Sequence, residues 1–99
     1  MESKTLTVVA IMKSRPGKEE ALRRELQSLV APTCHESGCI NYHLHQDIED
    51  PARFVFHENW TSKAHLDAHL NSPHLTAFKA RAPDLLAEPP QLILAEKIG

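Results

Sequence analysis

Residues 5–13, TLTVVAIMK, form the stretch that most limits what this chain can fold into. They are rich in β-branched residues and almost continuously apolar, which is typical of a strand covered on both faces. Alternate side chains of a strand point to opposite sides. Both sets are largely apolar here: Thr7, Val9 and Ile11 on one side, and Leu6, Val8, Ala10 and Met12 on the other.

The next elements are a helix and a β-hairpin. Pro16-Gly17 ends the first strand, and a helix with one apolar stripe is predicted to follow and to end near Pro32. Residues 39–46, CINYHLHQ, alternate as a strand does, and residues 54–60, FVFHENW, form the antiparallel partner across a turn at Asp50-Pro51. The helical stripe consists of Leu22, Leu26, Leu29 and Val30. One face of the hairpin carries Ile40, Tyr42, Leu44, Phe54, Phe56, Glu58 and Trp60, and the other carries Asn41, His43, His45, His57 and Asn59.

A second helical region and a last strand complete the order. Ser62 is a predicted N-cap, and Ser72-Pro73 restarts the helix. A proline-rich stretch, residues 83–90, leads into a strand at QLILAEKI. The order β-α-β-β-α-β is the split βαβ arrangement of a ferredoxin-like sandwich, an α+β fold with two helices on one face of an antiparallel sheet. The other apolar face of residues 5–13 then predicts a homodimer with its sheets packed face to face.

The length of the chain and its net charge disfavour several classes of protein. Ninety-nine residues fit one domain, expected to span residues 1–99. No apolar run approaches the roughly 20 residues that span a bilayer, and residues 1–4 lack the features of a secretory signal, so we expect a cytoplasmic protein with no membrane partner. A net charge of −2 with scattered basic residues disfavours nucleic acid. Cys34 and Cys39 are expected to be buried, reduced thiols.

Residues 36–78, ESGCINYHLHQDIEDPARFVFHENWTSKAHLDAHLNSPHLTAF, resemble the antibiotic biosynthesis monooxygenase (ABM) domain. The shared features are an acidic residue and Gly-Cys before an aromatic residue, Glu-x-Trp at a strand end, and a helix of the form HLxxHxxSPH. The opening VVAIMKSRPGKEEAL also matches, and the nearest likeness is to small bacterial quinol monooxygenases. The resemblance implies a dimeric α+β barrel that oxidises quinols or phenols with O₂ and needs neither metal nor flavin.

Eight side chains are candidates for the site. His69 matches the second histidine of HLxxH and is the predicted base, because an imidazole titrates near neutral pH and can accept a phenolic proton. Glu58, the second catalytic candidate, lies on a mostly apolar face and needs a donor, such as a helix histidine or a backbone group. Tyr42, Glu58 or an asparagine would assist His69. The predicted substrate-binding residues are Tyr42, Phe56, Trp60, His65, His74 and Phe78.

Several alternatives stay open beside the cofactor-independent quinol monooxygenase. Tyr42 and Trp60 could be plain core residues, and His69 could be a half-buried histidine bound to a backbone carbonyl. His43, His45 and His57 could bind a divalent metal ion. Haem is disfavoured, because the haem-degrading relatives resemble one another in an asparagine on the first strand and Ala10 lies near that place.

Other functions remain on the same fold. An isomerase or binder of a small phosphorylated signalling sugar would need convergent basic residues, and a non-catalytic dimeric barrel would bind ligands or serve in a stress response. An RNA-recognition module shares the order of elements, but the first strand has no aromatic platform. The basic residues that a sugar phosphate would need are not obviously convergent: Arg53, Lys63, Lys79 and Arg81.

Overall fold

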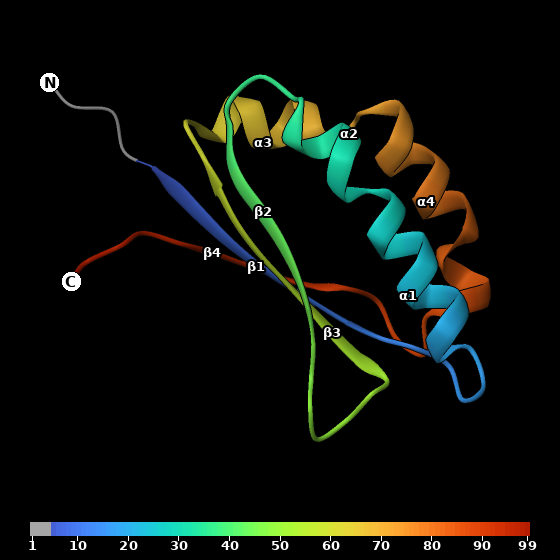
Figure 1. Cartoon of the computed structure of the whole chain (residues 1–99). Helices are drawn as coiled ribbons and strands as arrows, with labels where there is room; N and C mark the ends of the chain where they lie inside the picture. The colour runs from blue at the N-terminus through green and yellow to red at the C-terminus, as the bar shows by residue number, and fades with distance from the viewer. Residues whose placement is uncertain (1–4) are drawn as a thin grey trace, which may run out of the picture.

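The computed structural model describes residues 5–99, and its elements follow the predicted order. The four strands form one antiparallel sheet in the order β2-β3-β1-β4, and the helices lie to one side of it (Figure 1). The predicted ferredoxin-like α+β fold is confirmed. Residues 1–4, where no secretory signal is expected, lie outside the described residues. The elements are β1 (Leu6–Lys13), α1 (Glu19–Ser28), α2 (Val30–Cys34), β2 (Cys39–Gln46), β3 (Arg53–Trp60), α3 (Lys63–Leu70), α4 (Pro73–Leu85) and β4 (Gln91–Ala95).

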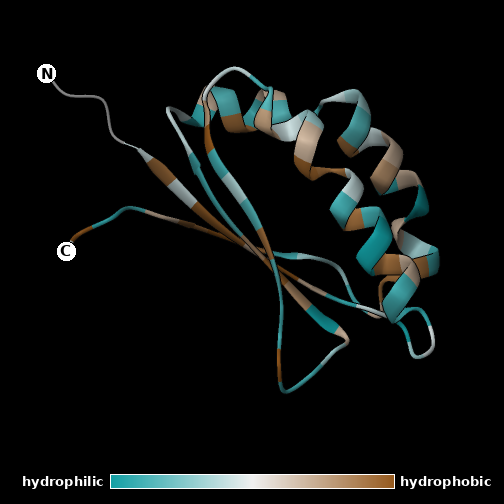
Figure 2. Cartoon of the chain, viewed as in Figure 1, coloured by the Kyte–Doolittle hydropathy of each residue, from teal (hydrophilic) through white to brown (hydrophobic). Residues whose placement is uncertain are grey.

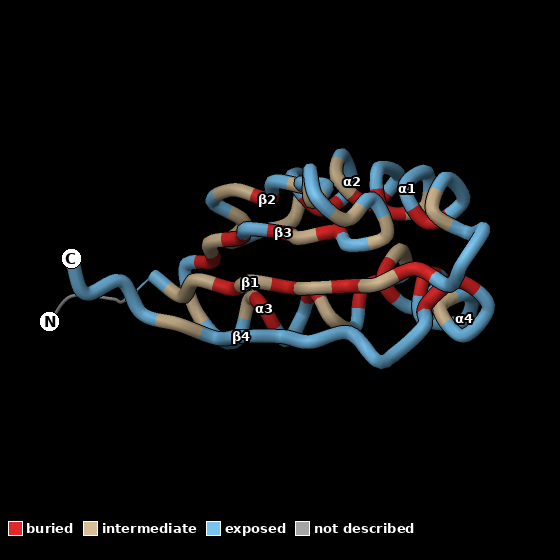
Figure 3. Tube along the Cα trace, turned by 90° about the horizontal axis from the view of Figure 1, so that it is seen from below, coloured by how far each residue is buried: buried red, intermediate tan, exposed pale blue. Residues whose placement is uncertain are grey.

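The hydrophobic core lies between the sheet and the helices. In β1 it takes Val8, Ala10 and Met12, the side chains on the helix-facing side of the strand. Figure 2 shows hydrophobic residues along much of β1 and β4 and a mixture of both kinds on the helices. In Figure 3 the tube of β4 is exposed over most of its length, whereas β1 and β3 carry the buried segments. Other buried members are Leu22, Leu26, Leu29, Tyr42, Phe54, Phe56, Trp60, Leu66, Leu75, Phe78, Leu85 and Leu86.

No helix of residues 5–99 lies on the opposite face of the sheet, which we call the open face. Val9 and Ile11 of β1 are half-buried there. A row of polar side chains crosses the strands: Thr7 Oγ1 donates to Asn59 Oδ1 at 2.6 Å, and Asn59 Nδ2 donates to Asn41 Oδ1 at 2.7 Å. The homodimer that would cover this face stays a prediction.

Two predicted helix boundaries were wrong. The first helical region does not end near Pro32, because α1 stops at Ser28 and α2 carries the chain through Pro32 to Cys34. A proline early in a helix is tolerated, since its missing N–H would have no partner in the first turn. The loop predicted from residue 83 begins later, because Pro83 lies inside α4.

A bulge in β2 overturns the predicted position of Ile40. Cys39 pairs with Trp60 and Asn41 with Asn59, so Ile40 is the extra residue between them. Its side chain is 54% exposed and lies beside His57 and Asn59 of the open face, away from Tyr42. The last strand ends at Ala95, three residues earlier than predicted.

The helix N-caps are as predicted, whereas the cysteines are not buried. Ser62 Oγ accepts from the His65 N–H, and Ser72 Oγ accepts from the Leu75 N–H. Cys34 and Cys39 are both free thiols, but Cys34 is exposed and Cys39 only partly covered. Burial raises the pKa of Cys39 to about 11. Across residues 5–99 no helix has the length and apolar character required to cross a membrane.

Candidate active site

A cavity of about 100 Å³, here called the inner cavity, lies between the helix-facing side of the sheet and helices α3 and α4. Its walls are mostly apolar and aromatic, with a few polar groups among them, which is the usual character of a small-molecule site. His69, Glu58, Tyr42, Phe56 and Phe78, five of the eight predicted residues, line it. The other lining residues were not predicted: Ala10, Met12, Leu70, Leu75, Lys79, Pro90 and Leu92.

His69 is held in one orientation by a carboxylate. Its side chain is 2% exposed, and its Nδ1 lies 2.7 Å from Glu36 Oε2. An ionised carboxylate only accepts hydrogen bonds, so Nδ1 carries the hydrogen and Nε2 keeps its lone pair. Burial lowers the pKa of His69, and Glu36 opposes this shift without cancelling it. The imidazole is therefore neutral at pH 7, the form that can accept a proton.

Glu36 joins two histidines. The same oxygen, Oε2, lies 2.7 Å from His74 Nε2, and the His74 side chain is 22% exposed. Glu36 lies in the turn between α2 and β2, and its role was missed although its acidic side chain belongs to the motif that carries the resemblance. His74, predicted to bind substrate, does not line the inner cavity and instead helps to hold this carboxylate.

The three groups also form the donor set that best suits a divalent ion. The ligand atoms of Glu36, His69 and His74 lie within 4.8 Å of one another, and two imidazoles with a carboxylate suit several transition metals. Residues 5–99 contain no other such group, so His43, His45 and His57 do not gather around one point. His43 does lie opposite His57 as predicted, with ring centroids 6.5 Å apart.

Glu58 finds its donor on its own strand. Trp60 Nε1 donates to Glu58 Oε1 at 2.9 Å, so the expected pairing with a helix histidine or a backbone group was wrong. Burial raises the pKa of Glu58 to about 7. Trp60 itself is fully buried and does not line the inner cavity, but its ring centroid lies 4.7 Å from that of His69. The Trp60 ring therefore packs against the His69 ring without being part of the cavity wall.

Tyr42 lies between the aromatic wall and the histidine. Its ring stacks on Phe56 with centroids 4.5 Å apart and meets the His69 ring edge-on at 5.3 Å. Burial raises the pKa of Tyr42 well above its usual value, so its hydroxyl stays protonated at neutral pH and can donate a hydrogen bond. None of the residues that line the inner cavity is an asparagine, so the expected amide helper is missing from its wall.

His65 lies outside the inner cavity. Its Nδ1 is 2.7 Å from Ser62 Oγ and 3.0 Å from Thr61 Oγ1, so it belongs to the start of α3. Of the four basic residues considered for a sugar phosphate, only Lys79 reaches the inner cavity, and its Nζ donates to the Leu70 carbonyl. The other three pair with carboxylates elsewhere: Arg53 with Asp47, Lys63 with Asp67 and Arg81 with Glu25.

Comparison with known proteins shows the family of the chain. Residues 5–81 match the family model described as "Antibiotic biosynthesis monooxygenase". The structure of PA3566 from Pseudomonas aeruginosa superposes with a TM-score of 0.94 at 36% identity, covering 100% of this chain and 99% of that one. The "Probable quinol monooxygenase YgiN" of Escherichia coli K12 is 34% identical over 74% of this chain and 80% of its own length.

A further relative is longer than this chain. The "Uncharacterized protein sll1783" of Synechocystis is 33% identical over 88% of this chain, but the match spans only 59% of that protein. The matches to the family model and to the Escherichia coli protein both cover most of the chain. The chain therefore belongs to the antibiotic biosynthesis monooxygenase family.

Proposed function

We propose that the protein is a cofactor-independent monooxygenase that oxidises a quinol or a related aromatic phenol with O₂. The observation that carries the proposal is the state of His69. Glu36 holds its Nδ1–H, and the ring lines a cavity walled by Tyr42, Phe56 and Phe78. A neutral, buried imidazole facing aromatic walls suits the deprotonation of a flat phenol.

The reaction begins with proton transfer from the substrate hydroxyl to His69 Nε2. The imidazolium that forms is stabilised by Glu36, 2.7 Å from Nδ1. The aryloxide is then paired with this imidazolium, and Tyr42 and Lys79 belong to the wall of the same cavity. Deprotonation makes the ring electron-rich enough to pass one electron to O₂.

The electrons then come from the substrate alone. Recombination of the substrate radical with superoxide forms a carbon–oxygen bond, and loss of water gives a hydroxylated quinone. A second electron transfer would instead give the simple quinone and hydrogen peroxide. In both cases one quinol and one O₂ balance the products, and the proton on His69 returns to the reduced oxygen.

The test is O₂ consumption by EDTA-treated protein with a reduced naphthoquinol, corrected for autoxidation in a blank without protein. We expect turnover in the wild type and a loss of about a hundredfold or more in His69→Ala, as for other general bases. Asp67→Ala is the control, because Asp67 is an exposed residue of the same helix and lies outside the inner cavity.

Two results would contradict the proposal. If the wild type consumes no more O₂ than the blank, the quinol assignment is wrong. If activity instead requires an added divalent metal, the donors of Glu36, His69 and His74 would be metal ligands and not a base with its support.

A further inference from the structure

Glu36, His69 and His74, here called the Glu36 cluster, come from three separate segments of the chain. Glu36 lies in the turn between α2 and β2, His69 in the last turn of α3, and His74 in the first turn of α4. Each imidazole has one ring nitrogen 2.7 Å from the same atom, Glu36 Oε2. Three donor atoms therefore gather in one place.

The chemistry of these donors is that of a zinc ligand set. Two imidazoles and one carboxylate bind Zn²⁺ in sites that leave the fourth position of the tetrahedron to water. All three ligand atoms of the Glu36 cluster lie within 4.8 Å of one another. Zinc bonds of about 2.1 Å place the ligand atoms of a tetrahedral site about 3.4 Å apart. The two contacts of 2.7 Å must therefore lengthen when an ion enters between the three atoms.

The side chains that have to move are the two nearest to solvent. Glu36 is 15% exposed and His74 is 22% exposed, whereas His69 is only 2% exposed. Glu36 belongs to a turn and His74 to the start of a helix, so both can adjust while His69 keeps its place in the core. The same exposure gives the ion and its water a path from the surface.

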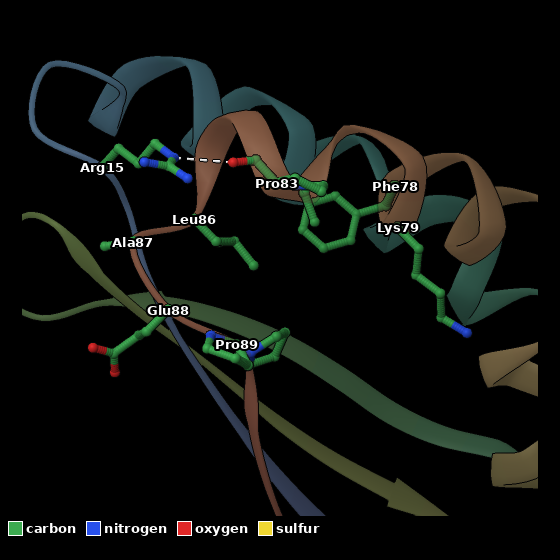
Figure 4. Close-up of a pocket in the computed structure, with 10 residues that line it drawn as sticks. Arg15, Phe78, Lys79, Pro83, Leu86, Ala87, Glu88 and Pro89 are labelled. Carbon is green, nitrogen blue, oxygen red and sulfur yellow. Dashed lines mark hydrogen bonds between the residues drawn. The ribbon is translucent and has the colours of Figure 1, made fainter.

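The charges around the Glu36 cluster leave its carboxylate to an incoming cation. The ion pairs of Glu36 in the described residues are with the two histidines. Lys79 adds a positive charge that acts on His69. Its Nζ, however, donates to the Leu70 carbonyl, and Figure 4 shows the Lys79 side chain extending away from the Phe78 ring. Lys79 therefore opposes the ion from a distance without occupying its position.

We propose that the Glu36 cluster is an inhibitory zinc site, in which Zn²⁺ takes the lone pairs of His69 Nδ1 and His74 Nε2. Each neutral ring then carries its hydrogen on the other nitrogen. His69 Nε2 becomes a donor and can no longer accept a proton. The ion is thus an inhibitor and not a cofactor. Zinc binding is independent of the proposed function, and only the inhibition rests on it.

The experiment titrates Zn²⁺ into untagged protein that has been treated with EDTA and dialysed, with calorimetry as the readout. We expect one ion to bind per chain. Imidazole ¹H–¹⁵N spectra, recorded in parallel, should show the hydrogen of His69 on Nδ1 before zinc is added and on Nε2 afterwards. Zinc bound elsewhere on the chain would not change the tautomer of this ring.

Three variants separate the Glu36 cluster from other histidines. Glu36→Gln keeps an oxygen for the imidazoles but removes the charge, and His74→Ala removes one ligand. Each should weaken zinc binding by at least about a hundredfold, because a ligand contributes more than an outer-shell partner. His35→Ala is the matched control and should keep the wild-type affinity, since this exposed ring is bound to the Ala31 carbonyl. Amide spectra with the wild-type dispersion show that each variant is folded.

The inference is overturned if the wild type binds no Zn²⁺, or if Glu36→Gln and His74→Ala bind it as tightly as wild type. In the O₂ assay Zn²⁺ should stop the wild type, while His74→Ala keeps its own zinc-free rate at the same concentration. Full turnover of the zinc-loaded wild type would also overturn the inhibition. Zinc binding at the Glu36 cluster without any O₂ consumption would keep the site and remove the proposed reaction, whereas turnover without zinc binding would do the reverse.

Discussion

Two glutamates near His69 are held in opposite ways. Glu36 accepts hydrogen bonds from two imidazoles through one oxygen. Glu58 accepts one bond from Trp60 and is otherwise surrounded by the core, so burial raises its pKa to about 7. One carboxylate is bound to two histidines of the site, while the other is bound to an indole N–H and enclosed by the core.

Glu58 should make stability fall as the pH rises. The pKa of Glu58 is about 7 in the fold, whereas that of an unperturbed glutamate is 4.5. Between these two pH values Glu58 is protonated in the folded chain and ionised in the unfolded chain. The free energy of unfolding therefore decreases as the pH rises through this range, and the loss is complete once the pH is above the folded pKa of about 7. Glu58→Gln keeps an oxygen for Trp60 without the charge. We expect it to be more stable than wild type by about 3 kcal/mol at pH 8.5 and nearly equal at pH 4.5.

Urea unfolding at the two pH values checks this, with Glu49→Gln at an exposed loop position as the control. An equal difference between Glu58→Gln and wild type at both pH values would show that burial does not disfavour the ionised carboxylate.

Single residues of the site could be predicted where they belong to a sequence motif or to a regular alternation of side chains. His69 follows from HLxxH and from its place beside the apolar stripe, and Tyr42, Phe56 and Glu58 follow from strand alternation. Glu36 does not follow, because its partner His69 is 33 positions away and their contact depends on how the α2–β2 turn meets α3. Hydrophobic periodicity predicts which side chains of one helix or strand share a face. It does not predict where a turn will contact a helix that follows much later in the sequence.

At the scale of elements, the turn between α2 and β2 is the part that aligns Glu36 with α3. Gly38 in this turn has φ +84°, and a Cβ there would lie 2.2 Å from Cγ of His65. The His65 ring thus packs directly on the glycine backbone. His65 therefore holds the turn against α3 by packing on Gly38. This contact keeps Glu36, two residues earlier, within hydrogen-bond distance of His69.

Gly38→Ala should be far more costly than Gly17→Ala. Gly17 has the same φ of +84°, but a Cβ there meets nothing within 4 Å. Its substitution isolates the backbone cost of about 1–2 kcal/mol, and the collision at Gly38 should add at least about 1 kcal/mol. In a His65→Ala background the cost of Gly38→Ala should fall only in part, because Cγ and Cδ2 of His65 are removed but the Cβ of residue 65 still lies 2.6 Å from the new methyl group. Urea unfolding of the cycle measures this, and an unchanged cost in that background would contradict the packing argument.

Elements were predictable to the extent that their signals are local. Ser62 and Ser72 cap helices as expected, because an N-cap depends on residues within one turn. The bulge at Ile40 and the position of Pro83 inside α4 were not predictable. Both depend on contacts made elsewhere: the bulge on how β2 and β3 pair, and the helix end on Arg15, which donates to the Pro83 carbonyl.

At the scale of the whole molecule, the open face of the sheet carries apolar side chains that the helices of the described residues do not cover. Val9, Ile11, Val55 and Ile93 present apolar surface there, beside the polar row of Thr7, Asn59 and Asn41. We propose that two chains pack these faces together, as the apolar second side of β1 predicts.

Val9→Lys tests this proposal, because it places a charge at the centre of the face, where burial without a partner is costly. We expect wild type to elute at twice its 11.1 kDa and Val9→Lys at 11.1 kDa, by size exclusion with light scattering. Ala80→Lys, on the exposed side of α4, should keep the wild-type mass. A wild type of 11.1 kDa at micromolar concentration would refute the dimer.

Trp60 is the only tryptophan of the chain, and its indole lies 4.7 Å from the His69 ring. Imidazolium quenches indole emission on contact, and neutral imidazole does so weakly. Indole emission therefore comes from one fluorophore, which lies against the candidate base. This emission should respond to the protonation of His69, and a Glu58→Gln background removes the response of the carboxylate that accepts from the indole N–H, with no dye, no cofactor and no turnover.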